Sequence, residues 1–239
     1  MSRDPDRRRL LGRALAFGAL SLLPGCDFDD LKHPDLADRA LSAMLNWNDR
    51  VQAALFSPAT LAATFPASAI TRPPRFNAYY GIDQVRVVDG AGWQLELSGA
   101  IADKRPWRLA DLRAAPQESQ ITRLICVEGW RVVGHWSGVP LRWFLRRIGA
   151  DTRARYVSFH CADGYYSSID MESALHPQTI LALDFLGEPL TPPFGFPLRL
   201  RIPTKLGFKN PKSVVALGVT NVFPSGYWEA QGYDWFSGS

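Results

Sequence analysis

The sequence predicts an α+β fold, with mixed sheets and short helices in a single main domain. Short apolar runs of strand length alternate with short helical patterns, and turns rich in proline and glycine separate them. No segment repeats, and no heptad pattern runs along the chain. With 239 residues, 46% of them hydrophobic, the chain has enough apolar material for one core of ordinary size.

The charge and cysteine content exclude several classes of protein. The formal net charge is only +4, and basic residues gather only at the N-terminus and in residues 199–212, so we expect no nucleic-acid partner. The 3 cysteines are an odd number without a C-x-x-C pair. Neither a disulfide-stapled small fold nor a zinc site is therefore indicated.

Residues 1–26 have the pattern of an export signal, which predicts a periplasmic or cell-envelope protein. The basic cluster Arg7–Arg9 resembles a twin-arginine signal, and it precedes an uncharged apolar stretch too short to span a bilayer. The following "LPGC" resembles a lipobox and makes Cys26 a candidate lipid anchor. The alternative is a plain secretory signal with an incidental cysteine. Residues 27–34 are then a polar tether, and residues 35–239 form the main domain.

The main domain opens with a helix, because residues 35–57 place apolar side chains at helical spacing before Pro58. "QVRVVDGAGWQLELSG", residues 84–99, predicts an antiparallel hairpin around the turn Asp89–Gly92. The later elements are predicted as helices over 109–116 and 139–149, and as strands in 121–127, 154–171, 179–190 and 197–203.

Cys126, in "RLICVEGWRVVGHW", is a candidate site residue because it ends an apolar run that breaks abruptly at Glu128. A strand that stops in this way delivers its last side chain to the edge of a sheet. A thiolate there could act as a nucleophile, with His135 or His160 as base, or as a metal ligand. The simpler interpretation is a small buried hydrophobic side chain, which is how most free cysteines behave.

Two further segments suggest a ligand. "RLRIPTKLGFKNPKS", residues 199–213, interleaves cations with prolines and glycine, an arrangement suited to a phosphate group. "RFNAYYG", residues 75–81, offers Asn77 and Tyr80 as hydrogen-bonding groups in a loop. A basic surface loop and an ordinary turn are the corresponding alternatives.

Together with the chain end, these segments resemble the sulfite oxidase-type molybdopterin-binding domain family. The resemblance runs from about Asp35 to the C-terminus. It is closest to the bacterial branch that includes the exported catalytic subunit of protein-methionine-sulfoxide reductase. The motifs that carry it are Asn77–Tyr80, Cys126–Trp130, Pro197–Arg199 with Lys205–Lys212, and Trp228–Tyr233.

The resemblance implies one molybdenum-molybdopterin cofactor per chain. Cys126 is the implied thiolate ligand of molybdenum and the catalytic residue, which disfavours a disulfide between Cys126 and Cys161. Lys212 and Arg199 are expected to pair with the cofactor phosphate and the pterin edge. The other residues expected to bind the cofactor are Asn77, Tyr80, Gly81, Cys161, Lys205, Lys209 and Asn210.

The implied reaction is oxygen-atom transfer, in which sulfoxides or N-oxides are reduced. Because no haem motif or flavin fingerprint occurs, electrons are expected from a partner, such as a membrane haem-type subunit. One alternative is oxidation of a small sulfur oxyanion such as sulfite, which would call for several arginines around the metal. A second is a non-catalytic envelope lipoprotein that keeps the fold, and a third is a thiol enzyme.

Two positions depart from the reductase branch. Phe194 stands where that branch has an asparagine before the P-x-R segment, and Gly81 stands where it has an acid. A phenylalanine side chain cannot hydrogen-bond the pterin, so we expect that contact to be lost or replaced.

Overall fold

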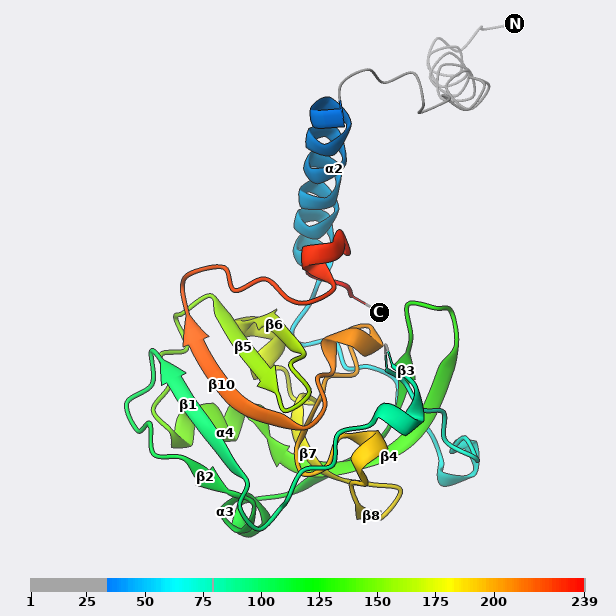
Figure 1. Cartoon of the computed structure of the whole chain (residues 1–239), viewed down its shortest axis with the longest axis vertical. Helices are drawn as coiled ribbons and strands as arrows, with labels where there is room; N and C mark the ends of the chain where they lie inside the picture. The colour runs from blue at the N-terminus through cyan, green and yellow to red at the C-terminus, as the bar shows by residue number, and fades with distance from the viewer. Residues whose placement is uncertain (1–33, 79, 239) are drawn as a thin grey trace, which may run out of the picture. The chain divides into compact units, whose positions relative to one another are not determined.

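The computed structural model describes residues 34–78 and 80–238 (Figure 1). The predictions for the export signal, for Cys26 and for the tether up to residue 33 lie outside the described residues. The chain divides into two compact units, Met1–Ala43 and Met44–Ser239. The second unit contains both sheets and all of the site residues. No described helix has the length and apolar character that a membrane span requires.

Two five-stranded sheets form the framework (Figure 1). The first has the order β2-β1-β10-β5-β6, and β1 runs parallel to β10. The second has the order β3-β4-β7-β8, with β9 paired to β7. The strands are β1 (Gln94–Gly99), β2 (Trp107–Arg108), β3 (Glu118–Ile125), β4 (Arg131–Pro140), β5 (Tyr156–Cys161), β6 (Tyr166–Asp170), β7 (Ile180–Phe185), β8 (Glu188–Pro189), β9 (Arg199–Arg201) and β10 (Val214–Thr220).

The helices are short apart from the first, as the sequence predicts. They are α2 (Pro34–Leu55), α3 (Leu109–Ala114), α4 (Leu141–Arg147) and α5 (Met171–Leu175). Side chains from both sheets and from α4 share one apolar core. Leu95 of β1, Leu217 of β10, Leu181 of β7 and Phe144 of α4 are all fully buried in it. Mixed sheets with short helices over a common core confirm the predicted α+β class.

The predicted hairpin over residues 84–99 is wrong, because only its second half forms a strand. β1 begins at Gln94, whereas residues 85–88 have no regular structure. Both edges of β1 are already paired, antiparallel with β2 and parallel with β10. No edge of β1 remains for residues 85–88, so the polar-apolar alternation there does not lead to pairing.

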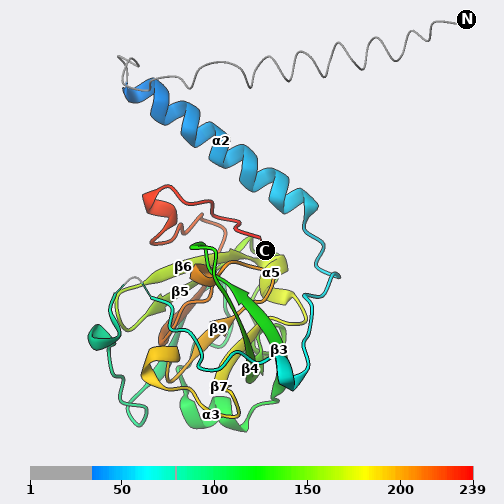
Figure 2. The same cartoon turned by 90° about the vertical axis from the view of Figure 1, so that its right-hand side faces the viewer.

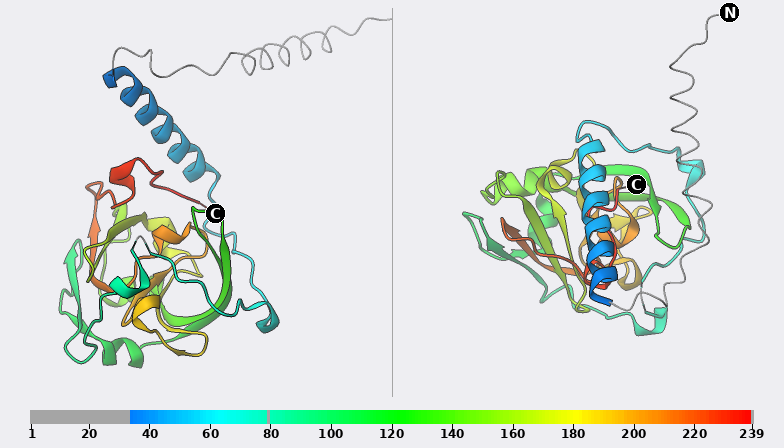
Figure 3. Two further views of the ribbon diagram at one scale, coloured as in Figure 1. Left: turned by 45° about the vertical axis from the view of Figure 1, so that its right-hand side comes forward. Right: turned by 90° about the horizontal axis from the view of Figure 1, so that it is seen from above.

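The strand connections bring residues of the predicted motifs into one pocket of the second unit. The strands β3, β4, β5, β6 and β9, from which these connections leave, are labelled in Figure 2. Cys126 opens the turn between β3 and β4, and Asp163 lies in the turn between β5 and β6. The basic segment from residue 202 to residue 213 connects β9 to β10, and these connections can be followed in Figure 3. A site built on loops is therefore supported by paired strands.

We predict that Gly138→Ala lowers the free energy of unfolding by about 1–3 kcal/mol, the usual cost of overpacking. β4 has a register shift at Gly138, where it meets β7, and an added Cβ would lie 2.1 Å from the Leu181 carbonyl oxygen. Urea denaturation of the mature chain would measure the change. Gly92→Ala is the matched control, because its nearest atom is a flexible carboxylate oxygen at 3.3 Å. Equal denaturation midpoints for the two variants would contradict the prediction.

Candidate functional site

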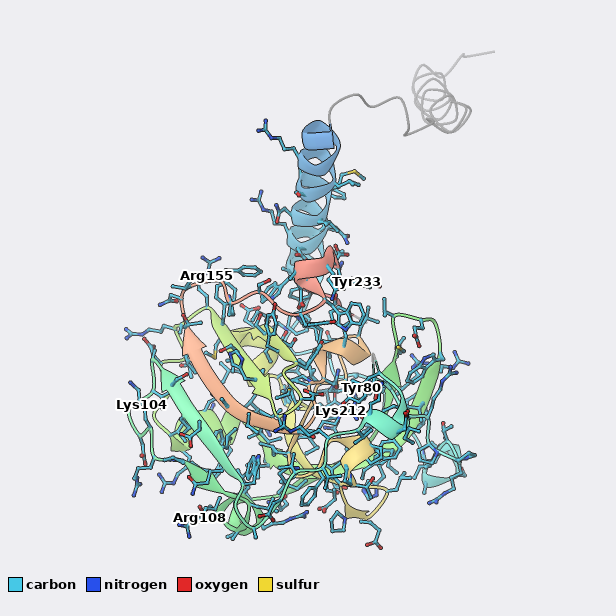
Figure 4. All side chains as sticks on the ribbon, in the orientation of Figure 1. Tyr80, Lys104, Arg108, Arg155, Lys212 and Tyr233 are labelled. Atoms are coloured by element: carbon cyan, nitrogen blue, oxygen red, sulfur yellow. The ribbon has the colours of Figure 1, made fainter. Side chains whose placement is uncertain are left out.

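One pocket gathers much of the predicted site. Cys126, Asn77, Tyr80, Asn210 and Lys212 all line it, although they come from three separate segments. Lys212 and Tyr80 lie side by side in Figure 4, with the Lys212 Nζ 5.7 Å from the centre of the tyrosine ring. The Tyr80 hydroxyl donates a hydrogen bond to Asp163 Oδ2 at 2.8 Å. This bond joins the loop at residue 80 to the β5–β6 turn across the pocket.

Cys126 presents a free, half-buried thiol to this pocket. Its backbone N–H donates to the Trp130 carbonyl at 2.9 Å, and its carbonyl accepts from Gly129 N at 3.0 Å, so a tight turn fixes its position. Burial raises the pKa of the Cys126 thiol, and the nearby Glu128 carboxylate adds to the rise. A bound metal cation would reverse that preference and stabilise the thiolate.

The two histidines considered as a base for Cys126 are not in the pocket. His135 is paired with Ile121 within the β3–β4 ladder, and the His160 ring stacks on Tyr166. No histidine is among the described residues that line the pocket. The thiol-enzyme interpretation with His135 or His160 as base is therefore not supported by the pocket lining.

Lys212 is the cation that reaches the pocket from the basic segment. Its Nζ donates to the carbonyl oxygens of Asn77 at 2.8 Å and of Pro193 at 3.0 Å. Burial, together with the neighbouring Arg199 guanidinium, lowers the pKa of Lys212 to about 7. A half-buried cation whose hydrogen bonds go to carbonyl oxygens, with no ion pair to a carboxylate among the described residues, would gain stability from a bound anion.

Arg199 adds a second buried positive charge behind Asn77. Its side chain is fully buried, and it donates to Phe194 O and to Asn77 Oδ1, both at 3.2 Å. Its Nε has no hydrogen-bond partner among the described residues. Burial lowers the pKa of Arg199 to about 9. Because no carboxylate compensates this charge within the described part of the chain, the site fits a ligand that carries a phosphate.

Phe194 makes one contact through its side chain and one through its backbone. Its ring packs on Phe185, with ring centres 4.9 Å apart, while its backbone carbonyl accepts the bond from Arg199. The side chain of residue 194 offers no hydrogen bond here, as expected from the sequence. The backbone of this residue nevertheless orients a predicted cofactor ligand.

Lys205 and Lys209 are not brought to the pocket. The Lys205 Nζ lies 3.2 Å from Asp170 Oδ1, and Lys209 forms an ion pair with the buried Glu229 carboxylate. Both side chains are almost fully buried, and each charge already has a carboxylate partner. Their assignment to cofactor binding stays a prediction, and these contacts give them a structural role.

The remaining predicted residues differ in whether they line the pocket. Asn210 lines the pocket, but its Oδ1 accepts from Arg201 and from Ile202 N, and its own N–H donates to Gly207 O at 3.1 Å. Asn210 therefore shapes the loop from within. Cys161 is free and buried, and burial raises the pKa of its thiol. Gly81 is exposed at the start of a short helical turn. Neither Cys161 nor Gly81 lines the pocket.

Sequence reasoning missed several pocket residues. Their signals were weak, because each lies only a few positions from a motif residue that was named. Arg75 is two residues before Asn77, and Asp163 follows Cys161 by two. Aromatic side chains complete the wall, and two of them come from the motif at the chain end. The missed residues that line the pocket include Arg75, Asp163, Tyr165 and Phe208.

The donor set matches a metal that arrives with ligands of its own. Within residues 34–78 and 80–238, no group of three or more His, Cys, Asp or Glu side chains converges on one point. Cys126 can therefore supply one soft thiolate but not a complete coordination sphere. Molybdopterin provides a dithiolene, which binds the metal, and a phosphate. The Cys126 thiolate would add one further ligand to that metal, and the cations Lys212 and Arg199 would pair with the phosphate.

Comparison with known proteins gives the same result. The family model of the oxidoreductase molybdopterin binding domain matches residues 82–228. The protein named "Putative protein-methionine-sulfoxide reductase subunit YedZ1" of Azospira oryzae is 55% identical over 235 residues, which cover 98% of this chain and 88% of that protein.

More distant relatives share part of their length with this chain. The protein-methionine-sulfoxide reductase catalytic subunit MsrP of Xanthomonas campestris pv. campestris is 36% identical over 57% of this chain and 47% of its own length. MsrP of Ralstonia nicotianae is 33% identical over 75% of this chain and 64% of its own length. The chain thus spans about half to two thirds of these two proteins.

A solved structure supports the fold. The sulfane dehydrogenase SoxCD of Paracoccus pantotrophus superposes with a TM-score of 0.54 at 20% identity, over 58% of this chain and 40% of that one. The predicted sulfite oxidase-like fold is confirmed. The family match and the pocket chemistry lead to one conclusion: the chain belongs to the oxidoreductase molybdopterin binding domain family.

Proposed function

We propose that this protein reduces sulfoxides by oxygen-atom transfer at a molybdenum-molybdopterin cofactor. The observation that carries the proposal is that a free Cys126 thiol and Lys212 line one pocket, while the buried Arg199, which has no carboxylate partner among the described residues, donates to the lining residue Asn77. The names of three relatives, each a protein-methionine-sulfoxide reductase subunit, support the direction of the reaction.

The chain's own residues would divide the work of holding the cofactor. Cys126 is the proposed molybdenum ligand, while Lys212 and Arg199 neutralise the phosphate. Asn77 accepts from Arg199 through its side chain and from Lys212 through its carbonyl, so it fixes both cations. When bound, the cofactor supplies a two-electron centre that can take an oxygen atom from a substrate.

The pocket favours a neutral S-oxide over a sulfur oxyanion. Arg75 is the one arginine among the described residues that line it, and Arg131, which follows Trp130, is not part of the lining. Holding a dianion such as sulfite calls for several arginines. Aromatic and aliphatic side chains fill much of the remaining wall, including Phe76, Val127, Phe208, Trp228 and Tyr233. Such a wall suits the apolar substituents of a sulfoxide, whether small or carried on a protein.

Electrons would come from a partner, and a membrane haem-type subunit is the proposed donor. The export-signal pattern of residues 1–26 supports a proposed location in the periplasm or cell envelope, with Cys26 as the candidate lipid anchor. In this proposal the anchor keeps the enzyme near its electron donor at the membrane surface.

We predict about one molybdenum per chain in the mature protein made in a host that synthesises the cofactor. Elemental mass spectrometry would measure it, alongside Cys126→Ala. The variant should lose molybdenum or change its electron paramagnetic resonance spectrum, because the soft ligand is removed. An unchanged circular dichroism spectrum would show that the variant is folded. A well-folded wild type without molybdenum would favour the non-catalytic alternative.

Reduction of methyl p-tolyl sulfoxide by the molybdenum-loaded protein, with a reduced viologen dye as electron donor, tests the direction of the reaction. We expect stoichiometric sulfide, and faster turnover than in the reverse assay with sulfite and an oxidised dye. Sulfite oxidation without sulfoxide reduction would replace the proposal with the first alternative.

Lys212 predicts a pH dependence of anion binding to the cofactor-free protein. Its pKa, lowered to about 7, should rise when an anion binds, so binding takes up a proton above pH 7. Affinity for sulfate, which does not titrate in this range, should therefore fall as the pH rises from 6 to 8. Isothermal titration calorimetry would measure this dependence. It should disappear in Lys212→Met and persist in Lys104→Met, which changes an exposed lysine.

A further inference from the structure

Arg75 is a cation of the pocket lining whose guanidinium N–H groups are available to a ligand. It lines the same pocket as Cys126, and its Cζ lies 4.7 Å from the centre of the Trp130 ring. The residue is exposed. Among the described residues, its guanidinium has neither a hydrogen-bond acceptor nor a carboxylate partner.

The stacking ties this guanidinium to the turn that carries Cys126. The Trp130 indole N–H donates to Glu128 Oε2 at 2.6 Å, and the Trp130 carbonyl accepts from Cys126 N at 2.9 Å. Both contacts fix the indole ring relative to the thiol. A guanidinium held over an aromatic ring by a cation–π contact does not use its N–H groups in conventional hydrogen bonds there, so they can still bind a ligand.

The other cation in the pocket lining differs in this respect. Lys212 Nζ already donates to two backbone carbonyls, and its position beside Arg199 suits the cofactor phosphate. Arg75 comes from a different segment from Lys212, and among the described residues no hydrogen bond links it to the groups that hold Lys212. Its charge is therefore available to something other than the phosphate.

We propose that Arg75 is the substrate-orienting residue of this site. It donates a charge-assisted hydrogen bond to the oxygen of the substrate S–O group, while the apolar wall at Val127, Phe208 and Trp228 contacts the substituents on sulfur. This inference rests on the proposed sulfoxide reduction and deepens it. Arg75 contacts the oxygen that departs, so the substrate is fixed by one polar and one apolar contact.

The reaction that Arg75 assists is balanced as follows. A sulfoxide R2SO takes two electrons from the electron-donor partner and two protons from water, and gives R2S and H2O. The S–O bond breaks and sulfur is reduced. Arg75 acts as a hydrogen-bond donor and transfers no proton. Its charge favours the build-up of electron density on the departing oxygen.

The test uses molybdenum-loaded enzyme, methyl p-tolyl sulfoxide and a reduced viologen dye. Arg75→Met, which keeps length but removes the donors, should lower kcat/KM by about 10- to 100-fold, as expected for one charge-assisted hydrogen bond. Arg75→Lys should recover part of that loss. Arg131→Met changes an exposed arginine one residue after Trp130, outside the pocket lining, and should stay within about twofold of wild type. Molybdenum per chain should be the same in all four proteins.

Chemical rescue separates a substrate contact from a packing role. In Arg75→Ala, added guanidinium chloride at low millimolar concentration should restore part of the activity, whereas sodium chloride at equal ionic strength should not. Unchanged kcat/KM in Arg75→Met would overturn the inference, as would loss of molybdenum, which would place Arg75 on the cofactor. Absence of rescue would also count against it. A wild type that binds molybdenum but reduces no sulfoxide would remove the proposed function itself, whatever the variants do.

Discussion

The site depends on the positive charge that β9 carries into the interior. Arg199 and Arg201 are both fully buried, and both stack on the Trp136 ring at 5.0 and 5.5 Å. Burying two guanidinium groups without a carboxylate costs several kcal/mol per charge unless dipoles and anions offset it. Arg201 donates hydrogen bonds to the Thr122 hydroxyl, the Arg123 carbonyl and the Asn210 side chain. These bonds connect β9 to β3 and to the basic segment. Arg199 instead donates to the side chain of Asn77, which lines the pocket.

The lysines of the basic segment have two different roles, structural ion pairing and the proposed anion binding, which cannot be told apart from the composition of the segment. Lys205 and Lys209 are neutralised by Asp170 and Glu229, which hold the segment against β6 and the C-terminal residues. Glu229 follows Trp228, so the Lys209 ion pair also places an aromatic residue on the pocket wall. Lys212 instead donates its hydrogen bonds to carbonyl oxygens and forms no ion pair among the described residues. Of the three lysines it is the one that lines the pocket, so its charge is available to an anion there.

Local motifs were predictable, whereas long-range pairing was not. Four of the predicted site residues line the pocket: Cys126, Asn77, Tyr80 and Lys212. They could be predicted because each belongs to a short motif with recognisable chemistry. The sequence does not predict β4 and β10 as strands, although each is paired on both edges within its sheet. The parallel pairing of β1 with β10 joins segments more than one hundred residues apart, and no local pattern encodes it. The neutralisation of Lys209 by Glu229 is hidden for the same reason.

The loop that carries Asn77 is held largely by groups that would also face the cofactor. Lys212 and Arg199 bind its carbonyl and its amide oxygen, and Tyr80 reaches Asp163 across the pocket. An anion that strengthens the charge on Lys212 also strengthens that residue's hydrogen bond to Asn77, since charged donors form the stronger bonds. Cofactor binding and the position of the loop are therefore thermodynamically linked, and each stabilises the other. Because Arg75 lies two residues before Asn77, the same linkage connects the position of the substrate-facing guanidinium to occupancy of the cofactor site.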